Sequence, residues 1–323
     1  MRKLLKKIYD NTDVRYFLLN PFLKIYNYLS FSLLSDEYIL KKKYLNKFGK
    51  KLDLSNPKTL NEKILWLKLN DRTPAHTQWA DKLRVRELIK SEIGESYLVP
   101  LLYTAKDVKN IIEKNIPDEP CIIKTNHDSG GGIFVYDKRG LDYKNIQRTL
   151  RRRLKVNYYQ KSKEWQYKDI IPCIVVEKLL VTKNGQIPND YKLHCFNGKV
   201  RMIQVDIGRG TANHFRNWYN KDWQREPYKW SSPKGPGKFT DPSSNDVSRP
   251  ETLEKMILLS ERISSYFDYV RVDWYDVDGK LFFGEVTFHH DGGTKPILPS
   301  VWDLNLGSEL IIKTLNTDNA TKN

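Results

Sequence analysis

Hydrophobic residues at helical spacing dominate the first third of the chain. Residues 1–50 mix Lys and Arg with Leu, Ile, Phe and Tyr, which predicts two amphipathic helices broken at Pro21. Thr59 and Glu62 have the spacing of a capping box and predict the start of another helix. A further helix is expected over 77–93, because a glycine follows its last apolar residue.

Strand patterns become frequent after residue 98. Short apolar runs occur at 98–103, 121–124, 171–182, 190–206, 270–275 and 280–287. Asn-Gly at 197–198 and Asp-Gly at 278–279 predict tight hairpin turns. Helices are expected over 108–114 and 250–266, and a loop rich in Ser, Pro and Gly over 231–249. Helices among hairpin-linked strands predict α/β or α+β architecture with mostly antiparallel sheet in the second half.

The composition permits a substantial core and gives a strongly basic surface. The chain has 323 residues, 39% of them hydrophobic, which excludes a fully disordered protein. A net charge of +16 attracts polyanions, whether nucleotide, nucleic acid, anionic lipid or acidic glycan. The three cysteines, Cys121, Cys173 and Cys195, form no CxxC pair, so neither a disulfide framework nor a zinc site is expected. A reducing cytosol fits this pattern.

The N-terminal segment does not have the pattern of an export signal. Asp10 and Asp13 fall where a signal peptide needs its apolar stretch. The most apolar segment, 17–34, is interrupted by polar residues and is too polar for the roughly 20 apolar residues of a spanning helix. Residues 1–50 are expected to pack on the body as a helical extension, or to contact an anionic membrane surface peripherally. A cytoplasmic protein is expected.

A glycine-rich loop between two strands is the first element with candidate chemistry. Lys124 ends the first strand, and the loop contains Ser129, Gly130, Gly131 and Gly132. Backbone amides of such a loop can surround phosphate oxygens without side-chain obstruction. The strand that follows disfavours a Walker loop or a dinucleotide fold, which both need a helix there. An ordinary glycine-rich hairpin with a surface lysine is the alternative.

A late hairpin carries the second element. Arg271 and Asp273 share one strand face, and Glu285 and Thr287 share a face of the next strand, because side chains alternate along a strand. The hairpin can bring the two faces together. Asp273 and Glu285 would then offer hard oxygen ligands for Mg²⁺, with Arg271 beside them to stabilise developing negative charge. A cross-strand ion pair on an exposed sheet is the alternative.

An apolar strand that ends in Glu177 is the third element. Its apolar residues could flank an adenine ring, while Glu177 and nearby backbone groups take the base edge or the ribose hydroxyls. A solvated glutamate at a strand end is the plain alternative.

The order of these three elements resembles the ATP-grasp superfamily, and more specifically its TupA-like branch, which is associated with teichuronopeptide and capsular polysaccharide biosynthesis. The resemblance spans roughly 58 to 312 and rests on six ordered motifs. They lie at 61–63, 80–86, 123–130, 164–167, 190–198 and 284–288.

The resemblance implies an α+β ATP-grasp fold, in which two subdomains with mostly antiparallel sheets clasp ATP. It implies a division into a helical extension (1–57), an N-terminal helical or α/β part (58–118), a small lid subdomain with the glycine-rich loop (119–182) and a large subdomain with the metal site (183–323). The first 57 residues lack the usual βαβ pattern, so the superfamily's N-terminal α/β domain is expected to be reduced or replaced.

The resemblance also implies residue roles. Lys82 and Lys124 would contact ATP phosphates under a mobile loop of Ser129 to Gly132. Adenosine would be held by Glu177, Lys178 and Leu180, and Mg²⁺ by Asp273 and Glu285. Arg271 would steady the transition state, and Lys192 would meet nucleotide or substrate. Thr287 stands where the superfamily usually has a metal-binding Asn and is the poorer ligand.

The implied reaction is phosphoryl transfer from ATP to a carboxylate, followed by attack of an amine on the acyl phosphate. Positioning and charge neutralisation dominate such chemistry, which fits several Lys and Arg without a Ser/His/Asp nucleophile set. The expected substrates are a uronic acid and an amino acid or small amine; no nucleic-acid partner is expected.

Two other functions remain open from the residues. A capsule glycosyltransferase would need a DxD-like element, and Asp276-Val-Asp278 has those letters but falls in a tight turn. A basic RNA- or glycan-binding module would account for the charge and the aromatics but leaves Lys124, Glu177, Asp273 and Glu285 unexplained.

Histidines and aromatics near these elements are expected to be structural. His289 and His290 are adjacent on a strand and point to opposite faces, so they do not predict a paired site. A structural or substrate-rim role is expected for them. Core or lid packing is expected for the aromatics, with stacking on sugar rings as the alternative, at Trp165, Tyr167, Trp218, Trp223 and Trp230.

Overall fold

The computed structural model describes residues 33–209, 211 and 213–313, so most of the helical prediction for 1–50 lies outside the described residues. Its last part is confirmed as α3 (Asp36–Phe48). The Ser35 hydroxyl accepts from the backbone amide of Tyr38 at the start of this helix, and Gly49 ends it in the left-handed conformation. Leu40 and Tyr44 bury one face of α3 against Leu65 of the next helix.

The capping box at Thr59 and Glu62 is confirmed as the start of α4 (Leu60–Asn70). The helix predicted over 77–93 is instead two helices, α5 (Pro74–Ala80) and α6 (Val85–Glu92). Asp81 separates them, because its carboxylate accepts from the backbone amides of Leu83 and Arg84 and caps a new helical start.

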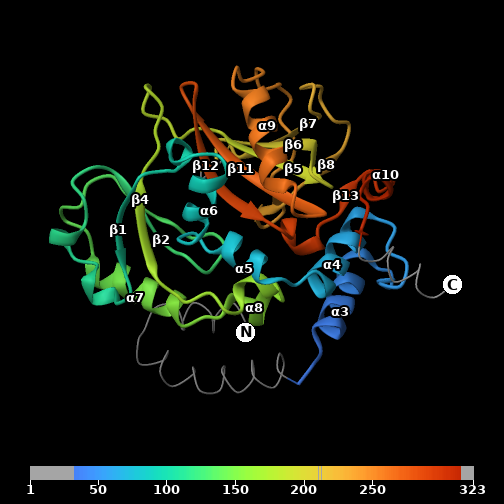
Figure 1. Cartoon of the computed structure of the whole chain (residues 1–323), viewed down its shortest axis with the longest axis horizontal. Coiled ribbons are helices and arrows are strands. Elements are labelled where there is room, and N and C mark those ends of the chain that lie inside the picture. Colours follow the sequence, from blue (N-terminus) through green and yellow to red (C-terminus); the bar gives the residue numbers. More distant parts are fainter. Residues whose placement is uncertain (1–32, 210, 212, 314–323) are drawn as a thin grey trace.

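A four-stranded antiparallel sheet in the order β1-β4-β2-β3 forms one end of the molecule (Figure 1). Its strands are β1 (Leu101–Ala105), β2 (Cys121–Thr125), β3 (Ile133–Val135) and β4 (Ile174–Lys178). Helix α7 (Tyr143–Leu154) buries Ile146 and Leu150 against it. Since β1 belongs to this sheet, the predicted boundary at 118/119 separates one strand from its partners. The domain division otherwise stays a prediction.

The helix predicted over 108–114 is wrong. Two short 3₁₀ turns stand there, η2 (Val108–Asn110) and η3 (Glu113–Asn115). Asp107 accepts from the backbone amide of Lys109, and the apolar residues at 108, 111 and 116 are buried at irregular spacing rather than along one helix face.

A five-stranded antiparallel sheet in the order β12-β11-β5-β6-β7 occupies the middle of the molecule. Its strands are β5 (Asp190–Phe196), β6 (Lys199–Ile207), β7 (Phe215–Tyr219), β11 (Tyr269–Val277) and β12 (Lys280–Thr287). Both predicted hairpin turns are confirmed, with φ of 49° and 83° at Asn197 and Gly198, and 52° and 86° at Asp278 and Gly279. Two consecutive positive φ values are the geometry that Asn-Gly and Asp-Gly turns favour.

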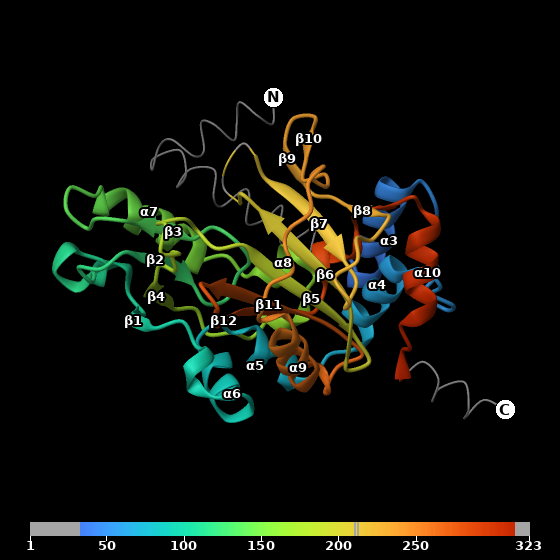
Figure 2. The ribbon, with the colours of Figure 1, turned by 90° about the horizontal axis from the view of Figure 1, so that it is seen from above.

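Different layers cover the two faces of the large sheet. Helix α9 (Leu253–Ser264), predicted as 250–266, packs Leu253, Met256 and Ile263 on one face. Helix α4 and α10 (Val301–Glu309) pack on part of the other face, around Trp218 and Trp230. Figures 1 and 2 both place α3, α4 and α10 at the end of the molecule opposite to the small sheet. The fold is thus α+β with antiparallel sheets.

Short elements complete the chain. They are η1 (Glu95–Tyr97), α8 (Tyr158–Ser162), η4 (Trp165–Tyr167), β8 (Lys229–Trp230), β9 (Pro233–Gly235), β10 (Lys238–Phe239), η5 (His290–Gly293) and β13 (Ile297–Leu298). The stretch predicted as a loop over 231–249 contains the small β9–β10 hairpin. Within the described ranges, every helix is too short or too polar to cross a membrane. All three cysteines are buried and free.

Candidate active site

The β11–β12 hairpin brings Arg271, Asp273 and Glu285 into contact. Arg271 Nε and Nη2 each lie 2.7 Å from an oxygen of Asp273, a bidentate pair. Nη2 also donates to Glu285 Oε1 at 3.2 Å, so both carboxylates share one nitrogen. The alternative of an exposed cross-strand pair is wrong for Arg271 and Asp273, because both are buried.

A β-bulge in β12 turns Glu285 toward Arg271. Val272 lies opposite Val286 and Trp274 opposite Phe283, so Gly284 and Glu285 together face Asp273. A Cβ at Gly284 would stand 3.1 Å from the carbonyl oxygen of Asp273, so the close approach of the two strands requires glycine. Without the bulge, the register that starts at the turn would place Glu285 opposite Val272, on the other face of the sheet. The alternation of the two strands gives no sign of the extra residue.

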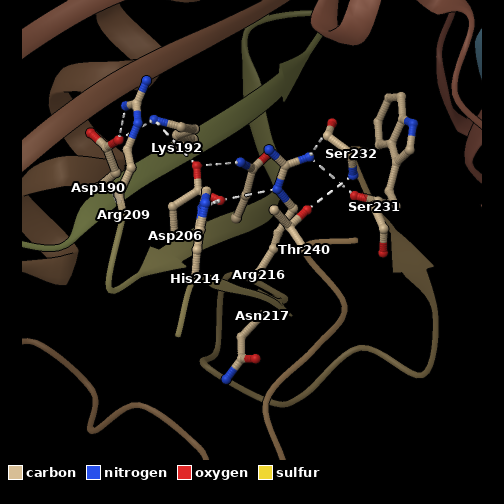
Figure 3. A network of polar contacts seen from close by, with 12 residues as sticks. Asp190, Lys192, Asp206, Arg209, His214, Arg216, Asn217, Ser231, Ser232 and Thr240 are labelled. Atoms are coloured by element: carbon tan, nitrogen blue, oxygen red, sulfur yellow. Dashed lines mark hydrogen bonds and ion pairs between the residues drawn. The ribbon is translucent and has the colours of Figure 1, made fainter. Parts of the chain in front are cut away.

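Lys192 of β5 lies opposite Asp273 on the strand next to β11, and three carboxylates surround it. Figure 3 shows two of them, Asp190 and Asp206. The Lys192 Nζ is 2.9 Å from Asp190, 3.1 Å from Asp273 and 3.8 Å from Asp206. Arg209 also pairs with Asp190. The Lys192 ammonium is thus surrounded by acidic side chains, and its predicted contact with nucleotide or substrate stays a prediction.

Burial and cations act in opposite directions on the two hairpin carboxylates. Burial raises the pKa of Asp273, against the effect of Arg271 and Lys192. Burial also acts to raise the pKa of Glu285, but Lys82, Arg271 and Lys192 outweigh it and leave that pKa lowered. Glu285 is therefore ionised at neutral pH, and 39% of its side chain is exposed.

Lys82 connects the helical segment to the glycine-rich loop. Its ammonium donates to the carbonyl of Asp128, and its backbone amide donates to the carbonyl of Asn126 at 3.2 Å. The Asn126 side chain in turn donates to Asp81 at 2.9 Å. Burial lowers the pKa of Lys82, and Glu285 is the strongest charge that opposes this shift. Lys82 therefore stands near both the loop and the hairpin.

Lys124 and Glu177 form an ion pair between adjacent strands. Lys124 Nζ lies 2.5 Å from one oxygen of Glu177, and Arg86 lies 3.4 Å from the other. Lys178 instead pairs with Glu119 on an exposed surface, and Leu180 follows the strand half-buried. The predicted adenosine contacts of Glu177, Lys178 and Leu180 stay predictions.

The glycine-rich loop is held from beneath by Arg153 of α7. Gly130 and Gly131 both have φ of 76°, which favours glycine, and Arg153 donates to their carbonyls. Arg153 also pairs with Asp128 at 2.7 Å. A Cβ at Gly132 would meet the Ile122 side chain at 2.5 Å. The role of Arg153 has no sequence signal, because it lies in a run of arginines typical of a solvated helix face.

A cavity of about 340 Å³ lies beside the hairpin. Four of the predicted residues line it: Ser129, Arg271, Glu285 and Thr287. Lys82, Lys124, Lys178, Lys192, Glu177, Leu180, Asp273 and the three loop glycines do not. Lys68 and Glu164 also line the cavity, although sequence reasoning gave neither a site role. Lys68 lies in α4, which is buried along most of its length, whereas a lysine is usually solvated.

His289 and His290 follow β12 instead of lying on a strand as predicted, since His290 begins η5, but their side chains do have separate positions. His289 lines the cavity and contacts Gln166 at 3.3 Å. His290 is buried, and its Nδ1 lies 2.8 Å from Arg271 Nη1. Burial lowers the pKa of both well below the usual range, so both are neutral at pH 7. Trp218 and Trp230 are buried and stacked at 5.6 Å, so they pack in the core.

The donor set fits magnesium only as part of a larger site. Among the residues with described positions, no cluster of three or more His, Cys, Asp or Glu could hold a metal ion by itself. Magnesium is usually bound by one or two carboxylates together with phosphate oxygens and water. Glu285, exposed to the cavity, with Asp273 and the Thr287 hydroxyl nearby, matches that requirement when a nucleotide phosphate is present.

Comparisons with known proteins agree with this picture. The family model "TupA-like ATPgrasp" matches residues 62–311. Similar solved structures include D-alanine–D-alanine ligase from Bacillus anthracis complexed with ATP, with 15% identity, a TM-score of 0.40, and 75% of this chain and 68% of that chain covered. D-alanine–D-alanine ligase from Helicobacter pylori has 12% identity, a TM-score of 0.41, and coverage of 78% and 69%. L-amino acid ligase from Bacillus licheniformis has 12% identity, a TM-score of 0.38, and coverage of 72% and 47%. No curated protein matches significantly.

Proposed function

The chain belongs to the TupA-like ATP-grasp family, and we propose that it joins an amino acid or small amine to the carboxylate of a uronic acid in capsule or cell-surface polysaccharide synthesis. Membership of that family makes it an ATP-dependent carboxylate–amine ligase. The acceptor, the amine and the pathway belong to the proposal. The cytoplasmic face of the membrane would be the place of such a reaction.

One observation carries the proposal: Arg271, Glu285, Thr287 and Ser129 of the glycine-rich loop face one cavity. A basic and an acidic group of the late hairpin and a residue of the phosphate loop thus meet where a carboxylate could be activated. The cavity volume falls at the lower end of the range for small-molecule sites, roughly 300–1,000 Å³.

The proposed roles of the protein's own residues combine the family pattern with the contacts described above. Lys82, Lys124 and the amides around Gly130 hold the phosphates, and Arg271 stabilises charge that develops beside Glu285. Asp273 orients Arg271 through the bidentate pair. Glu285 and Asp273 would hold magnesium, which would supply positive charge beside the phosphates. Catalysis then rests on positioning and electrostatics.

The charge of the molecule supports an acidic acceptor. A net charge of +16 raises the local concentration of an anionic glycan or a nucleotide sugar near the site. The glycosyltransferase alternative loses its metal motif, since Asp276 accepts from Thr252 and the Gly279 amide, and Asp278 accepts from the Lys183 amide. Both aspartates therefore serve turn structure.

The test is ADP formation and acyl-phosphate trapping. D-glucuronic acid, D-galacturonic acid and UDP-glucuronic acid are each supplied with ATP, Mg²⁺ and hydroxylamine, which traps an acyl phosphate as a hydroxamate. We expect ATP-dependent hydroxamate from at least one acid, with loss of product in Glu285→Gln. The control Glu254→Gln alters an exposed carboxylate that pairs with Arg249 on the surface. Absence of hydroxamate and ADP with all three acids would contradict the proposal.

A further inference from the structure

Two buried side chains of opposite charge line the cavity and have no role in the proposed nucleotide site. Lys68 of α4 is only 2% exposed, and its ammonium makes one long hydrogen bond, 3.4 Å to the carbonyl of Gly292. Glu164 Oε1, the carboxylate oxygen near it in the described structure, is 3.9 Å away, beyond hydrogen-bond distance. An ammonium has three donors, so Lys68 retains donors for a ligand.

Glu164, which lines the same cavity, also has few polar partners for its carboxylate. It is 8% exposed, and its Oε2 accepts from Gln166 at 3.2 Å. Its Oε1 has Lys68 at 3.9 Å as the ion-pair contact among the described residues. Burial raises the pKa of Glu164, while Lys68 and Lys43 lower it, and burial lowers the pKa of Lys68 to about 8. Buried charges of this kind are destabilising unless hydrogen-bonded partners satisfy them.

Both side chains reach the same space as the hairpin. Lys68, Glu164, Arg271, Glu285 and Ser129 line one cavity, so a ligand between the first two lies within that space. Glu285 is also among the charges that act on Glu164. A group held at Glu164 is therefore close to the place where the proposed acyl phosphate would form.

We propose that Lys68 and Glu164 bind the amine co-substrate of the proposed ligase, and that this co-substrate is an α-amino acid whose carboxylate contacts Lys68 and whose amino group contacts Glu164. This inference rests on the proposed function. A simple amine would satisfy Glu164 and leave the buried Lys68 without a counter-charge. A carboxylate ligand without an amino group would form an ion pair with Lys68 but would be repelled by Glu164. An α-amino acid completes both, because its ammonium and carboxylate groups are attached to the same carbon atom.

The test compares amino acids with their decarboxylated amines on the full chain. Glycine with methylamine, L-alanine with ethylamine and L-leucine with isopentylamine are titrated by calorimetry, after a thermal-shift screen of the twenty amino acids. We expect at least one amino acid to bind at least ~10-fold more tightly than its amine, the effect of one charge-assisted hydrogen bond. No preference for any amino acid over its amine would overturn the inference.

Variants assign that preference to the two residues. Lys68→Met should abolish the preference for the carboxylate, and Glu164→Gln should weaken amino acid and amine alike by ~10-fold or more. Lys63→Met is the matched control, since Lys63 lies in the same helix and donates to the carbonyl of Leu310. Circular dichroism shows whether each variant is folded. If Lys68→Met is unfolded, the binding measured for Glu164→Gln tests the inference alone. Unchanged binding in a folded variant would overturn the inference.

The hydroxylamine assay separates this inference from the proposed function, because hydroxylamine needs no amino acid site. Hydroxamate formation without amino acid preference would refute the amino acid site alone. Preferential amino acid binding without hydroxamate from any acid would refute the proposed acid substrates and leave the Lys68 and Glu164 site in place.

Discussion

The hairpin carboxylates Asp273 and Glu285 have the same predicted role as metal ligands but different structural surroundings. Substitution of each residue should therefore have a different effect on the stability of the fold. Asp273 is 2% exposed and accepts three hydrogen bonds from cations, two from Arg271 and one from Lys192. Glu285 accepts one such bond, at 3.2 Å, and opens to the cavity. Asp273→Asn should therefore destabilise the fold, whereas Glu285→Gln should not.

The expected magnitude follows from those contacts. The amide nitrogen of an asparagine would face a donor in either orientation, because every partner of Asp273 is a donor. Removal of one partner of a buried ion pair is destabilising by about 3–5 kcal/mol. Since asparagine keeps one acceptor oxygen, we expect a loss of about 3 kcal/mol in the free energy of unfolding for Asp273→Asn. A glutamine at 285 keeps its acceptor, and we expect a change within about 0.5 kcal/mol.

Urea denaturation followed by tryptophan fluorescence measures the difference. With a slope of about 3 kcal/mol per molar, the midpoint of Asp273→Asn should fall by about 1 M, and that of Glu285→Gln should stay near the wild-type value. Both variants should lose turnover under the proposed function. A wild-type midpoint for Asp273→Asn would refute the claim that Asp273 holds two buried cations together.

Three further predictions follow from other contacts. Gly284→Ala should destabilise by about 1–3 kcal/mol and lower turnover, because its Cβ would stand 3.1 Å from the Asp273 carbonyl, and urea midpoints with ADP assays would measure both effects. Lys124→Met should raise the KM for ATP by ~10-fold or more, measured by initial rates, while Lys90→Met, which alters a surface pair with Glu95, serves as control. Burial lowers the folded-state pKa of four histidines, so the unfolded chain binds more protons below about pH 6.5. Stability should therefore fall as the pH drops through that value, which urea midpoints between pH 5 and 8 would measure. The four are His127, His194, His289 and His290.

Local interactions were predictable from the sequence, and the features set by distant contacts were not. The Thr59 capping box and the two hairpin turns depend on residues within four positions of each other. The break at Asp81 is different, because that carboxylate also accepts from Asn126, which lies 45 residues away. The bulge that presents Glu285 likewise depends on the packing of two strands. A local sequence pattern therefore predicts neither the helix break at Asp81 nor the bulge beside Glu285.

Charged residues inside the molecule were the hardest to predict. Lysine and glutamate are rarely buried, so nothing in the sequence indicates that Lys68 and Glu164 are. Only the assembly of α3, α4, α8 and η5 around them forms a cavity and removes them from water. The proximity of Asp273 and Glu285 was predictable because both lie on one hairpin, whereas Lys68 and Glu164 belong to segments nearly a hundred residues apart.

The buried charges under the hairpin are better explained by positioning than by stability. Arg216 of β7 pairs with Asp206 at 3.0 Å and with Asp291 at 3.3 Å, so it ties the far edge of the sheet to the cavity wall. Asp206 also pairs with Lys192, Lys192 pairs with Asp273, and Asp273 pairs with Arg271. Well-packed apolar residues would often stabilise such a core equally well or better. The ionic chain instead fixes the direction of the Arg271 guanidinium and the position of the Asp291 wall together, and a site that works by electrostatic positioning requires that both be fixed before substrate binds.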